Sequence, residues 1–264
     1  GDVRDYERIL FASEKSDLII HAAATKIVPT AEEFPTECIK TNVLGAINVI
    51  KAAKQNKVSK VIALSTDKAC NPINLYGATK LTSDKLFISS NEYKKNSTTF
   101  AVVRYGNVIN SRGSVIPFFR SFNKNESLPI THVKMTRFMI SLDDAVKLVL
   151  LTYKKMIGGE IFVKKCSSIK LVDIAKAIHK NPRFKIIGVR PGEKIHEEMI
   201  SINDARNTYE FKTYYKILPE MVDIKNLTKM KKFGKKVKND FNYISNNNKD
   251  WIGSQKLFKF IQTI

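Results

Sequence analysis

One short polar turn brings together more reactive side chains than any other part of this sequence. Residues 60–64 (KVIAL) form an apolar run that predicts a buried strand. Directly after it, Thr66, Asp67 and Lys68 supply a hydroxyl, a carboxylate and an amine. Groups of these types can donate and accept protons when a strand end holds them next to a ligand. The turn is therefore the first candidate for a catalytic site.

A second pair of reactive groups follows on a predicted helix that runs from Tyr76 to about Tyr93. The spacing of four residues places Tyr76 and Lys80 on one helical face. An ammonium next to a phenol stabilises the phenolate and lowers its pKa, which suits the tyrosine to remove a proton from a hydroxyl. A Tyr-x-x-x-Lys pair also occurs by chance on many helices. Its position just after the Ser-Thr-Asp-Lys turn favours the functional interpretation.

The elements around this site alternate between strand and helix. Residues 17–24 predict a strand, 35–55 an amphipathic helix and 99–104 a further strand. This β-α-β-α-β order predicts a parallel sheet with right-handed crossovers. Further elements are predicted as a helix at 146–156, a strand at 160–163, a helix at 171–179 and a strand at 185–188. Beyond Pro219 the chain is rich in Lys and Asn, so we expect a poorly ordered or peripheral extension.

Composition limits the classes of protein that remain. The 264 residues are 43% hydrophobic and 27% charged, which is typical of a soluble globular protein. The three cysteines have no metal-ligand spacing, so we expect reduced thiols in a cytoplasmic protein, and the four scattered histidines predict no metal site. The net charge of +20 leaves nucleic-acid binding open. We favour no nucleic acid, because the lysines are spread along the chain without interleaved aromatic residues, and no membrane, because no apolar run approaches the roughly 18 residues that a membrane helix needs.

Residues 64–86 (LSTDKACNPINLYGATKLTSDKL) closely resemble the extended short-chain dehydrogenase/reductase superfamily. Within it they resemble the inverting UDP-N-acetylglucosamine 4,6-dehydratases that open pseudaminic acid synthesis. Sugar epimerases and ordinary 4,6-dehydratases share the Tyr-Lys pair but place other residues at Asp67 and Lys68. Similar segments occur along the whole chain, at 21–24 (HAAA), 40–45 (KTNVLG), 104–108 (RYGNV), 111–115 (SRGSV), 135–138 (MTRF), 190–194 (RPGEK) and 241–245 (FNYIS).

The resemblance implies a fold of the α/β class, a Rossmann-like doubly wound parallel sheet with a smaller C-terminal substrate-binding α/β region. It assigns residues 1–107 and 138–165 to the NADP-binding domain, 108–137 and 166–218 to the UDP-sugar region, and 219–264 to an extension. The family's Gly-rich turn (G-x-x-G-x-x-G) is not in this sequence. We therefore expect that about sixty residues of N-terminal βαβαβ structure are missing. The resemblance also suggests a homo-oligomer.

The resemblance assigns roles to individual residues. The implied catalytic residues are Thr66, Asp67, Lys68, Tyr76 and Lys80. The implied cofactor-binding residues are Asp2, Val3, Ala22, Ala23, Lys26, Tyr76, Lys80 and Val108. The implied UDP-sugar-binding residues are Lys26, Thr66, Asn107, Arg112, Val115, Thr131, Arg190 and Glu193, with Arg137 as a second choice of phosphate ligand. Alternatives remain open, since the alanines can simply pack against a helix, Lys26 can be a surface lysine, and Arg-Pro-Gly-Glu can be a plain turn.

The chemistry implied by the resemblance is a dehydration with internal hydride transfer through NADP. Tyr76 takes the proton of the C4 hydroxyl, and Lys80 lowers the pKa of that tyrosine. Lys68 removes the C5 proton, provided that desolvation keeps its amine near neutral pH, and a protonated Asp67 gives its proton to the leaving C6 hydroxyl. Two other functions stay open. One is a retaining 4,6-dehydratase, against which the presence of Tyr76 argues, and the other is a non-catalytic Rossmann-like binding protein.

Overall fold

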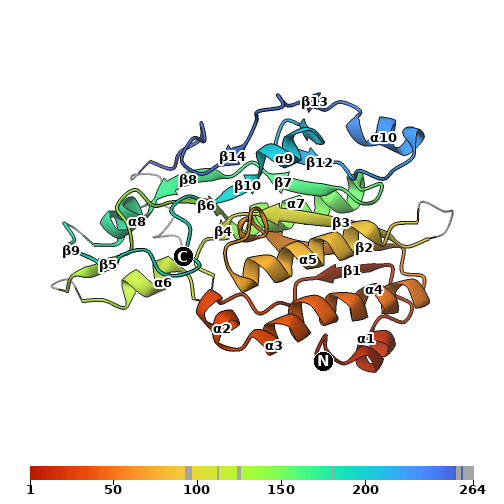
Figure 1. Cartoon of the computed structure of the whole chain (residues 1–264), viewed down its shortest axis with the longest axis horizontal. Helices are drawn as coiled ribbons and strands as arrows, with labels where there is room; N and C mark the ends of the chain where they lie inside the picture. Colours follow the sequence, from red (N-terminus) through yellow and green to blue (C-terminus); the bar gives the residue numbers. More distant parts are fainter. Residues whose placement is uncertain (93–96, 112, 124–125, 180, 254–256, 258–264) are drawn as a thin grey trace.

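The computed structural model describes residues 1–92, 97–111, 113–123, 126–179, 181–253 and 257, and its elements are labelled in Figure 1. The helical elements are α1 (Tyr6–Ala12), α2 (Val28–Glu33), α3 (Pro35–Ile39), the π-helical turn η1 (Lys40–Leu44), α4 (Gly45–Gln55), the 3₁₀ turn η2 (Asp67–Ala69), α5 (Leu75–Ser89), α6 (Val115–Arg120), α7 (Leu142–Lys155), α8 (Leu171–Ile178), α9 (Ile202–Ala205) and α10 (Ile224–Lys231). The strands are β1 (Leu18–His21), β2 (Lys60–Thr66), β3 (Thr99–Tyr105), β4 (Asn107–Val108), β5 (Leu128–Ile130), β6 (Thr136–Ile140), β7 (Ile161–Lys164), β8 (Ser167–Lys170), β9 (Phe184–Ile186), β10 (Glu198–Ile200), β11 (Thr208–Glu210), β12 (Tyr214–Ile217), β13 (Lys235–Lys236) and β14 (Tyr243–Ile244).

A seven-stranded sheet in the order β1-β2-β3-β7-β12-β11-β13 forms the centre of the molecule. Its first four strands are parallel, and β12, β11 and β13 continue it in antiparallel pairings. Helices α4 and α5 cover one face and α7 lies behind the other, as Figure 1 shows. A mostly parallel sheet with helices on both faces is the Rossmann-like α/β architecture predicted from the sequence.

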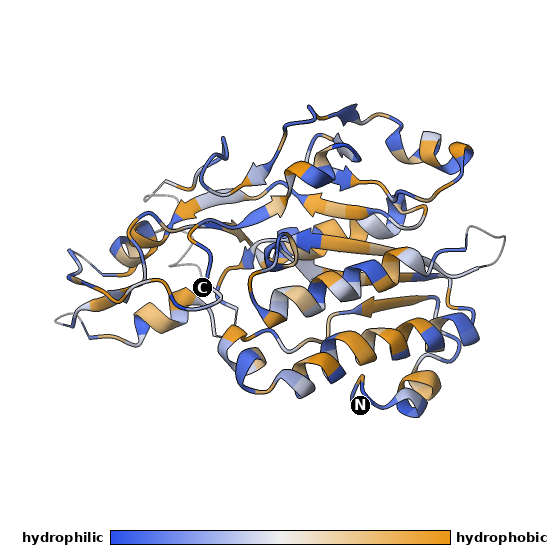
Figure 2. Ribbon diagram, viewed as in Figure 1, coloured by the Kyte–Doolittle hydropathy of each residue, from blue (hydrophilic) through white to orange (hydrophobic). Residues whose placement is uncertain are grey.

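The sheet holds because its central strands are apolar on both faces. Phe100, Val102 and Val103 of β3 are fully buried, as expected for a parallel strand between two helical layers. Helix α4 turns Val49 and Ala53 toward the same core and leaves lysines in solvent. Figure 2 shows the apolar colouring concentrated in the central strands. This packing fixes the carboxyl ends of β1, β2 and β3 along one edge.

A smaller lobe continues from that edge. It contains the three-stranded sheet β4-β6-β8, the parallel pair β5-β9, and helices α6 and α8. Its core is separate from that of the large sheet and includes Phe119, Leu128, Ile130 and Ile174. Strand β10 pairs with β14 of the C-terminal segment. The junction between lobe and sheet is where ligands bind in open α/β folds.

Two sequence predictions need correction. The helix predicted at 35–55 is present, but it is built from α3, the π-helical turn η1 and α4. The poor order expected after Pro219 is wrong for residues 219–253, where β13 joins the large sheet, β14 pairs with β10, and Met230 is fully buried. The proposed domain boundaries stay a prediction, and both of these strand pairings join the extension to strands within residues 166–218.

Two further observations concern the whole described chain. Cys38, Cys70 and Cys166 are free and buried. Among the helices that the structure describes, none is long and apolar enough to cross a membrane.

Candidate active site

The polar turn lies at the carboxyl end of β2, and helix α5 packs directly against it. The Asn74 side chain caps α5 by accepting the Gly77 N–H at 2.7 Å. A Cβ atom on Gly77 would lie only 2.3 Å from the Lys68 carbonyl oxygen. Glycine is therefore required at this point of close approach, and it lets Tyr76 lie against the turn. The spacing between the turn and the tyrosine thus has a physical cause.

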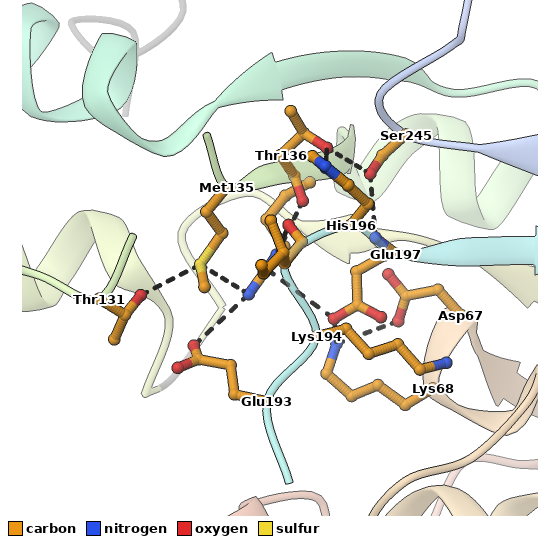
Figure 3. Close-up of polar contacts among 12 residues, drawn as sticks. Asp67, Lys68, Thr131, Met135, Thr136, Glu193, Lys194, His196, Glu197 and Ser245 are labelled. Carbon is orange, nitrogen blue, oxygen red and sulfur yellow. Dashed lines mark hydrogen bonds and ion pairs between the residues drawn. The ribbon is translucent and has the colours of Figure 1, made fainter. Parts of the chain in front are cut away.

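Three side chains form the centre of the site (Figure 3). The Lys68 ammonium donates to Asp67 Oδ1 at 3.1 Å and lies 3.2 Å from Glu197 Oε1. The Thr66 hydroxyl donates to the same Asp67 oxygen at 2.9 Å. Asp67 and Glu197 are 1% and 2% exposed, so both carboxylates are removed from water. One ammonium is therefore shared between two buried acids.

Burial and mutual charge set the proton affinities in this cluster. Burial raises the pKa of Asp67, and the nearby charge of Glu197 adds to the rise while Lys68 opposes it. Burial also raises the pKa of Glu197, but Lys68 and Arg137 outweigh it and bring that pKa below its ordinary value. Burial lowers the pKa of Lys68, yet Asp67 and Glu197 more than compensate and hold it above its ordinary value. The expectation that desolvation keeps the Lys68 amine near neutral pH is wrong in this structure.

The pKa values of Tyr76 and Lys80 on α5 also differ from what the sequence predicts. Burial raises the pKa of Tyr76 to about 12, while Lys68 and the Thr66 hydroxyl act in the opposite direction. Burial lowers the pKa of Lys80, whose acidic neighbour is Asp84. Lys68 therefore exerts the lowering effect on the pKa of Tyr76 that the sequence analysis assigned to Lys80. Lys80 is only 3% exposed and lies on the same buried side of α5.

A buried ion pair joins the turn to the C-terminal part of the chain. Asp84 of α5 accepts the Ser65 hydroxyl at 2.6 Å and an Arg104 nitrogen at 3.3 Å. The same guanidinium donates to the Met199 carbonyl of β10 at 2.9 Å. Because Arg104 and Asp84 are 3% and 1% exposed, this pair fixes β10 beside the catalytic turn.

The segment before β10 is anchored to the turn. The Lys194 ammonium donates to the Cys70 carbonyl at 2.6 Å, and the Asn74 amide donates to the Gly192 carbonyl at 2.7 Å. These bonds hold the segment before β10 against the residues that follow the polar turn. Such anchoring keeps a loop in register with polar groups on another element.

Two arginines and one acid lie in that segment and beside it. Arg190 is exposed and pairs with Glu193, its nitrogen 3.1 Å from Oε1. Arg137 of β6 is buried and reaches Glu193 Oε1 at 3.4 Å and Glu197 Oε1 at 3.8 Å. Arg137, the second choice as phosphate ligand, thus lies deeper in the site than Arg190.

The other predicted sugar ligands lie in the smaller lobe. Asn107 is in β4, and its Oδ1 is buried without a hydrogen-bond partner among the described residues. Val115 begins α6, and the buried Thr131 donates its hydroxyl to Met135 Sδ at 3.2 Å. Arg112 lies outside the described residues. The unpaired amide oxygen of Asn107 marks a position that a donor from a ligand can satisfy.

The predicted cofactor residues surround the end of β1 and the sheet edge beside it. Ala22, Ala23 and Lys26 follow β1 and are exposed, while Val108 in β4 is half-buried. Small exposed residues at a strand's carboxyl end leave room for a dinucleotide beside the backbone. Their contact with a cofactor, like that of the buried Lys80, stays a prediction.

The predicted adenine contacts lie at the start of the chain, beside α4. Asp2 is exposed and pairs with Arg4 at 2.7 Å. Val3 accepts a hydrogen bond from Asn48 through its carbonyl and lies next to Gly45. The contact of both residues with a cofactor stays a prediction.

Glu197 is the one central residue that the sequence did not predict. It comes 129 positions after Lys68 and immediately precedes β10, where Glu198 faces outward and Met199 inward. The sequence did contain one signal for it, because Glu197 and Glu198 are adjacent acids at the start of an apolar strand. Two adjacent acids, of which one must face the core, indicate a buried carboxylate, and a buried carboxylate needs a cation.

These features define a Rossmann-type α/β protein whose reactive side chains gather at the carboxyl edge of a parallel sheet. The family model described as polysaccharide biosynthesis protein matches residues 1–219. The chain belongs to this family.

Curated relatives support the resemblance. Two proteins of Campylobacter jejuni subsp. jejuni named UDP-N-acetylglucosamine 4,6-dehydratase (inverting) are 52% and 53% identical over 269 residues, covering 99% of this chain and 80% of theirs. A UDP-glucose 4-epimerase of Rickettsia bellii is 44% identical over 223 residues, covering 82% of this chain and 65% of its own length.

Solved structures share the fold. The structure titled as Pen from Bacillus thuringiensis has a TM-score of 0.87 and 36% identity, covering all of this chain and 81% of its own. DesIV, a dTDP-glucose 4,6-dehydratase from Streptomyces venezuelae with NAD bound, has a TM-score of 0.66 and 19% identity, covering 74% of this chain and 68% of its own. The second likeness shows the fold alone.

Proposed function

We propose that this protein dehydrates UDP-N-acetylglucosamine across C5 and C6 after oxidation at C4, with NADP as cofactor and inversion at C5. The product is then UDP-2-acetamido-2,6-dideoxy-β-L-arabino-hexos-4-ulose. The observation that carries the proposal is the Asp67–Lys68 contact of 3.1 Å, next to Tyr76 at the end of β2. An acid and a base so close together suit an elimination, in which one proton is removed while another is given. The two Campylobacter relatives bear the name of this activity.

A nicotinamide dinucleotide bound at this edge would supply a hydride acceptor that later returns the hydride. Ala22, Ala23, Lys26, Lys80 and Val108 would hold its nicotinamide half, and Asp2 with Val3 would lie toward its adenine. Lys80 is buried in α5, and we assign its ammonium to a ribose hydroxyl of this cofactor, as the resemblance implies. We infer NADP rather than NAD from the family resemblance.

Tyr76 receives the proton of the C4 hydroxyl in the first step. Because a phenol with a pKa of about 12 is protonated at neutral pH even beside the Lys68 charge, Tyr76 gives its own proton to solvent before it accepts the proton of the C4 hydroxyl. Thr66 lies beside it and donates a hydrogen bond to the developing C4 ketone. The ketone then acidifies the proton at C5.

Lys68 and Asp67 carry out the elimination. Transfer of one proton from the ammonium to Asp67 Oδ1 converts the ion pair into a neutral amine and a neutral acid without a change in net charge. Exclusion of water by a bound sugar favours this neutral form, because both groups are already poor in solvent. The amine then takes the C5 proton, and the acid protonates the departing C6 hydroxyl, which leaves as water.

The UDP part is held by the loop that covers the turn. Arg190 and Arg137 provide guanidinium groups for the diphosphate, and Glu193 accepts ribose hydroxyls once its present partner Arg190 turns to the phosphates. Asn107, Val115 and Thr131 are assigned to the sugar, as is Arg112, which lies outside the described residues. We further propose that the protein is cytoplasmic and homo-oligomeric and that its product feeds pseudaminic acid synthesis, as the resemblance implies.

The test is turnover of UDP-N-acetylglucosamine by the full-length protein with NADP or NAD, followed by mass spectrometry. We expect loss of one water from the sugar with no net consumption of cofactor. Asp67→Asn is the matched variant, because it keeps the shape of the side chain but cannot give up a proton. A wild-type protein that forms no dehydrated sugar with either cofactor would contradict the proposal.

A second candidate function is 4-epimerisation, since a relative that is 44% identical is named UDP-glucose 4-epimerase. Epimerisation needs the tyrosine and the cofactor but no acid–base pair at C5 and C6. It is recognised by a C4-epimeric product of unchanged mass. Retention of that activity in Asp67→Asn would favour the epimerase over the dehydratase.

A further inference from the structure

Glu197 lies 3.2 Å from the ammonium of Lys68, the proposed C5 base, and nothing in the proposed reaction yet uses it. We infer that Glu197 is a positioning residue that holds Lys68 under the sugar and strengthens it as a base. This inference rests on the proposed function. Glu197 itself exchanges no proton with the substrate.

The backbone around Glu197 is locked in place. Its N–H donates to Ser245 Oγ at 3.0 Å, and its carbonyl accepts the Ser245 N–H at 2.8 Å. The Ser245 hydroxyl also hydrogen-bonds the Thr136 hydroxyl at 2.6 Å, and Thr136 contacts His196 Nδ1 at 2.8 Å. Figure 3 shows this chain of contacts behind the carboxylate. Strands from three parts of the sequence therefore fix one side chain against Lys68.

The buried Glu197 carboxylate costs more stability than a side chain with only a structural role would. Its Oε1 takes both cations, Lys68 at 3.2 Å and Arg137 at 3.8 Å, whereas its Oε2 is buried without a hydrogen-bond partner among the described residues. A buried acceptor without a partner costs stability that an apolar side chain would avoid. Such a cost is typical of a site that is built for a charge at one position.

The groups that face this cluster determine the sign of the effect. Lys68 is faced by Asp67, Glu197 and Arg137, and Glu197 by Lys68, Arg137 and Lys194. Arg137 and Lys194 keep Glu197 ionised. In that state Glu197 favours the ammonium form of Lys68, which agrees with the raised pKa of this lysine.

The elimination shows why this matters. Lys68 starts as an amine and ends as an ammonium when the C5–H bond breaks. Asp67 starts protonated and ends as a carboxylate when the C6–O bond breaks and water leaves. Glu197 keeps its charge throughout, so it stabilises the ammonium that forms at the C5 deprotonation and disfavours the earlier proton transfer from Lys68 to Asp67 by the same interaction. Its net contribution to the reaction is therefore to hold the Lys68 nitrogen in place for the C5 proton.

The test compares Glu197→Gln with Glu198→Gln in the full-length protein. Glu198 is the matched control, because its carboxylate faces away from Lys68 and accepts from Asn71, which a glutamine oxygen can also do. The first readout is acetylation of Lys68 by acetic anhydride at pH 8, measured by mass spectrometry against exposed Lys51. An opposite charge at this distance shifts a pKa by about one to three units. We expect acetylation of Lys68 to rise ~10-fold or more in Glu197→Gln and to stay unchanged in Glu198→Gln.

The second readout is catalytic. We expect Glu197→Gln to lower kcat and the incorporation of solvent deuterium at C5 together, by roughly 10- to 100-fold, with KM within about twofold. Unchanged Lys68 acetylation in a folded Glu197→Gln variant would overturn the inference. If that variant does not fold, the wild type decides, since Lys68 that reacts like Lys51 from pH 8 to 10 would also overturn it. The acetylation readout needs no turnover, so a failure of the proposed dehydration shows separately.

Discussion

Asn42 is the residue whose replacement should most clearly connect the fold to the site. It lies in the π-helical turn η1 and is 1% exposed. Its Oδ1 accepts the Thr25 N–H at 2.8 Å, and its Nδ2 donates to the Thr25 carbonyl at 3.1 Å and to the Thr79 hydroxyl at 3.0 Å. One amide therefore ties the loop after Ala23 to the helix that carries Tyr76.

Asn42→Leu keeps a similar volume but removes all three of these bonds. A buried polar group left without a partner costs about 1–3 kcal/mol, and water can reach the half-buried Thr25 in part. We expect the free energy of unfolding to fall by roughly 2–4 kcal/mol, measured by urea denaturation at pH 7. Asn42→Asp should also destabilise, because a carboxylate can accept from the Thr25 N–H but cannot donate to its carbonyl.

Asn48→Ala is the control for this prediction. The Asn48 amide likewise donates to two backbone carbonyls, those of Val3 and Arg4, but in a more exposed turn. Its loss should cost about 1 kcal/mol or less. Equal destabilisation by Asn42→Leu and Asn48→Ala would refute the reasoning that burial makes the Asn42 hydrogen bonds more important for stability.

Three other substitutions test neighbouring parts of the account. Tyr76→Phe should leave the free energy of unfolding nearly unchanged but lower dehydration ~10²- to 10⁴-fold, because phenylalanine cannot accept the C4 proton; a loss of only a few-fold in a steady-state assay would exclude Tyr76 as the base. Burial, with the charge of Lys80, lowers the pKa of His21 from 6.5 to about 4, so the folded state binds fewer protons than the unfolded state between these values. This difference contributes about 3 kcal/mol to the free energy of unfolding above pH 6.5, and the contribution is lost as the pH falls toward 4. Denaturant titrations at pH 7 and pH 5 should show a smaller loss of stability in His21→Leu than in the wild type. Equal losses of stability in the two proteins would disprove the link. Arg104→Met should destabilise by about 3–5 kcal/mol because it leaves buried Asp84 unpaired, and adding Asp84→Asn should recover part of that loss; no recovery in the double variant would point to lost packing instead.

Local sequence signals were sufficient for the parallel strands of the central sheet and for the turn. The apolar runs of β2 and β3 and the periodicity of α4 and α7 are continuous stretches whose burial follows from their own composition. Gly77 also has a local cause, since it follows the tyrosine that must lie against the turn. The order of strand, reactive turn and helix could therefore be predicted without tertiary information.

The remainder depends on contacts between distant segments. Glu197 reaches Lys68 only because the Arg104–Asp84 pair and β14 place β10 beside the turn, and none of these pairings leaves a periodic signal in the sequence. The same contacts explain why Lys68 has a raised pKa, since the sequence showed one of its two carboxylate neighbours. Strands of two to four residues, such as β4 and β13, are too short for period-two alternation to identify.

The order of the C-terminal segment was missed for a related reason. Its buried residues, such as Met230 and Tyr243, occur singly among lysines and asparagines, so the average composition indicates poor order. Each of them is buried by a strand or helix from elsewhere in the chain. Composition cannot show this kind of packing.

The stereochemistry at C5 tests the central claim most directly. The full-length protein, UDP-N-acetylglucosamine and NADP would be incubated in deuterium oxide and the sugar product followed by NMR. The account predicts a 4-keto-6-deoxy sugar of the L-arabino configuration that carries solvent deuterium at C5, because Lys68 removes that proton and another returns on the opposite face. A product with C5 retained in the D-xylo configuration, or a C4 epimer without deuterium at C5, would contradict it.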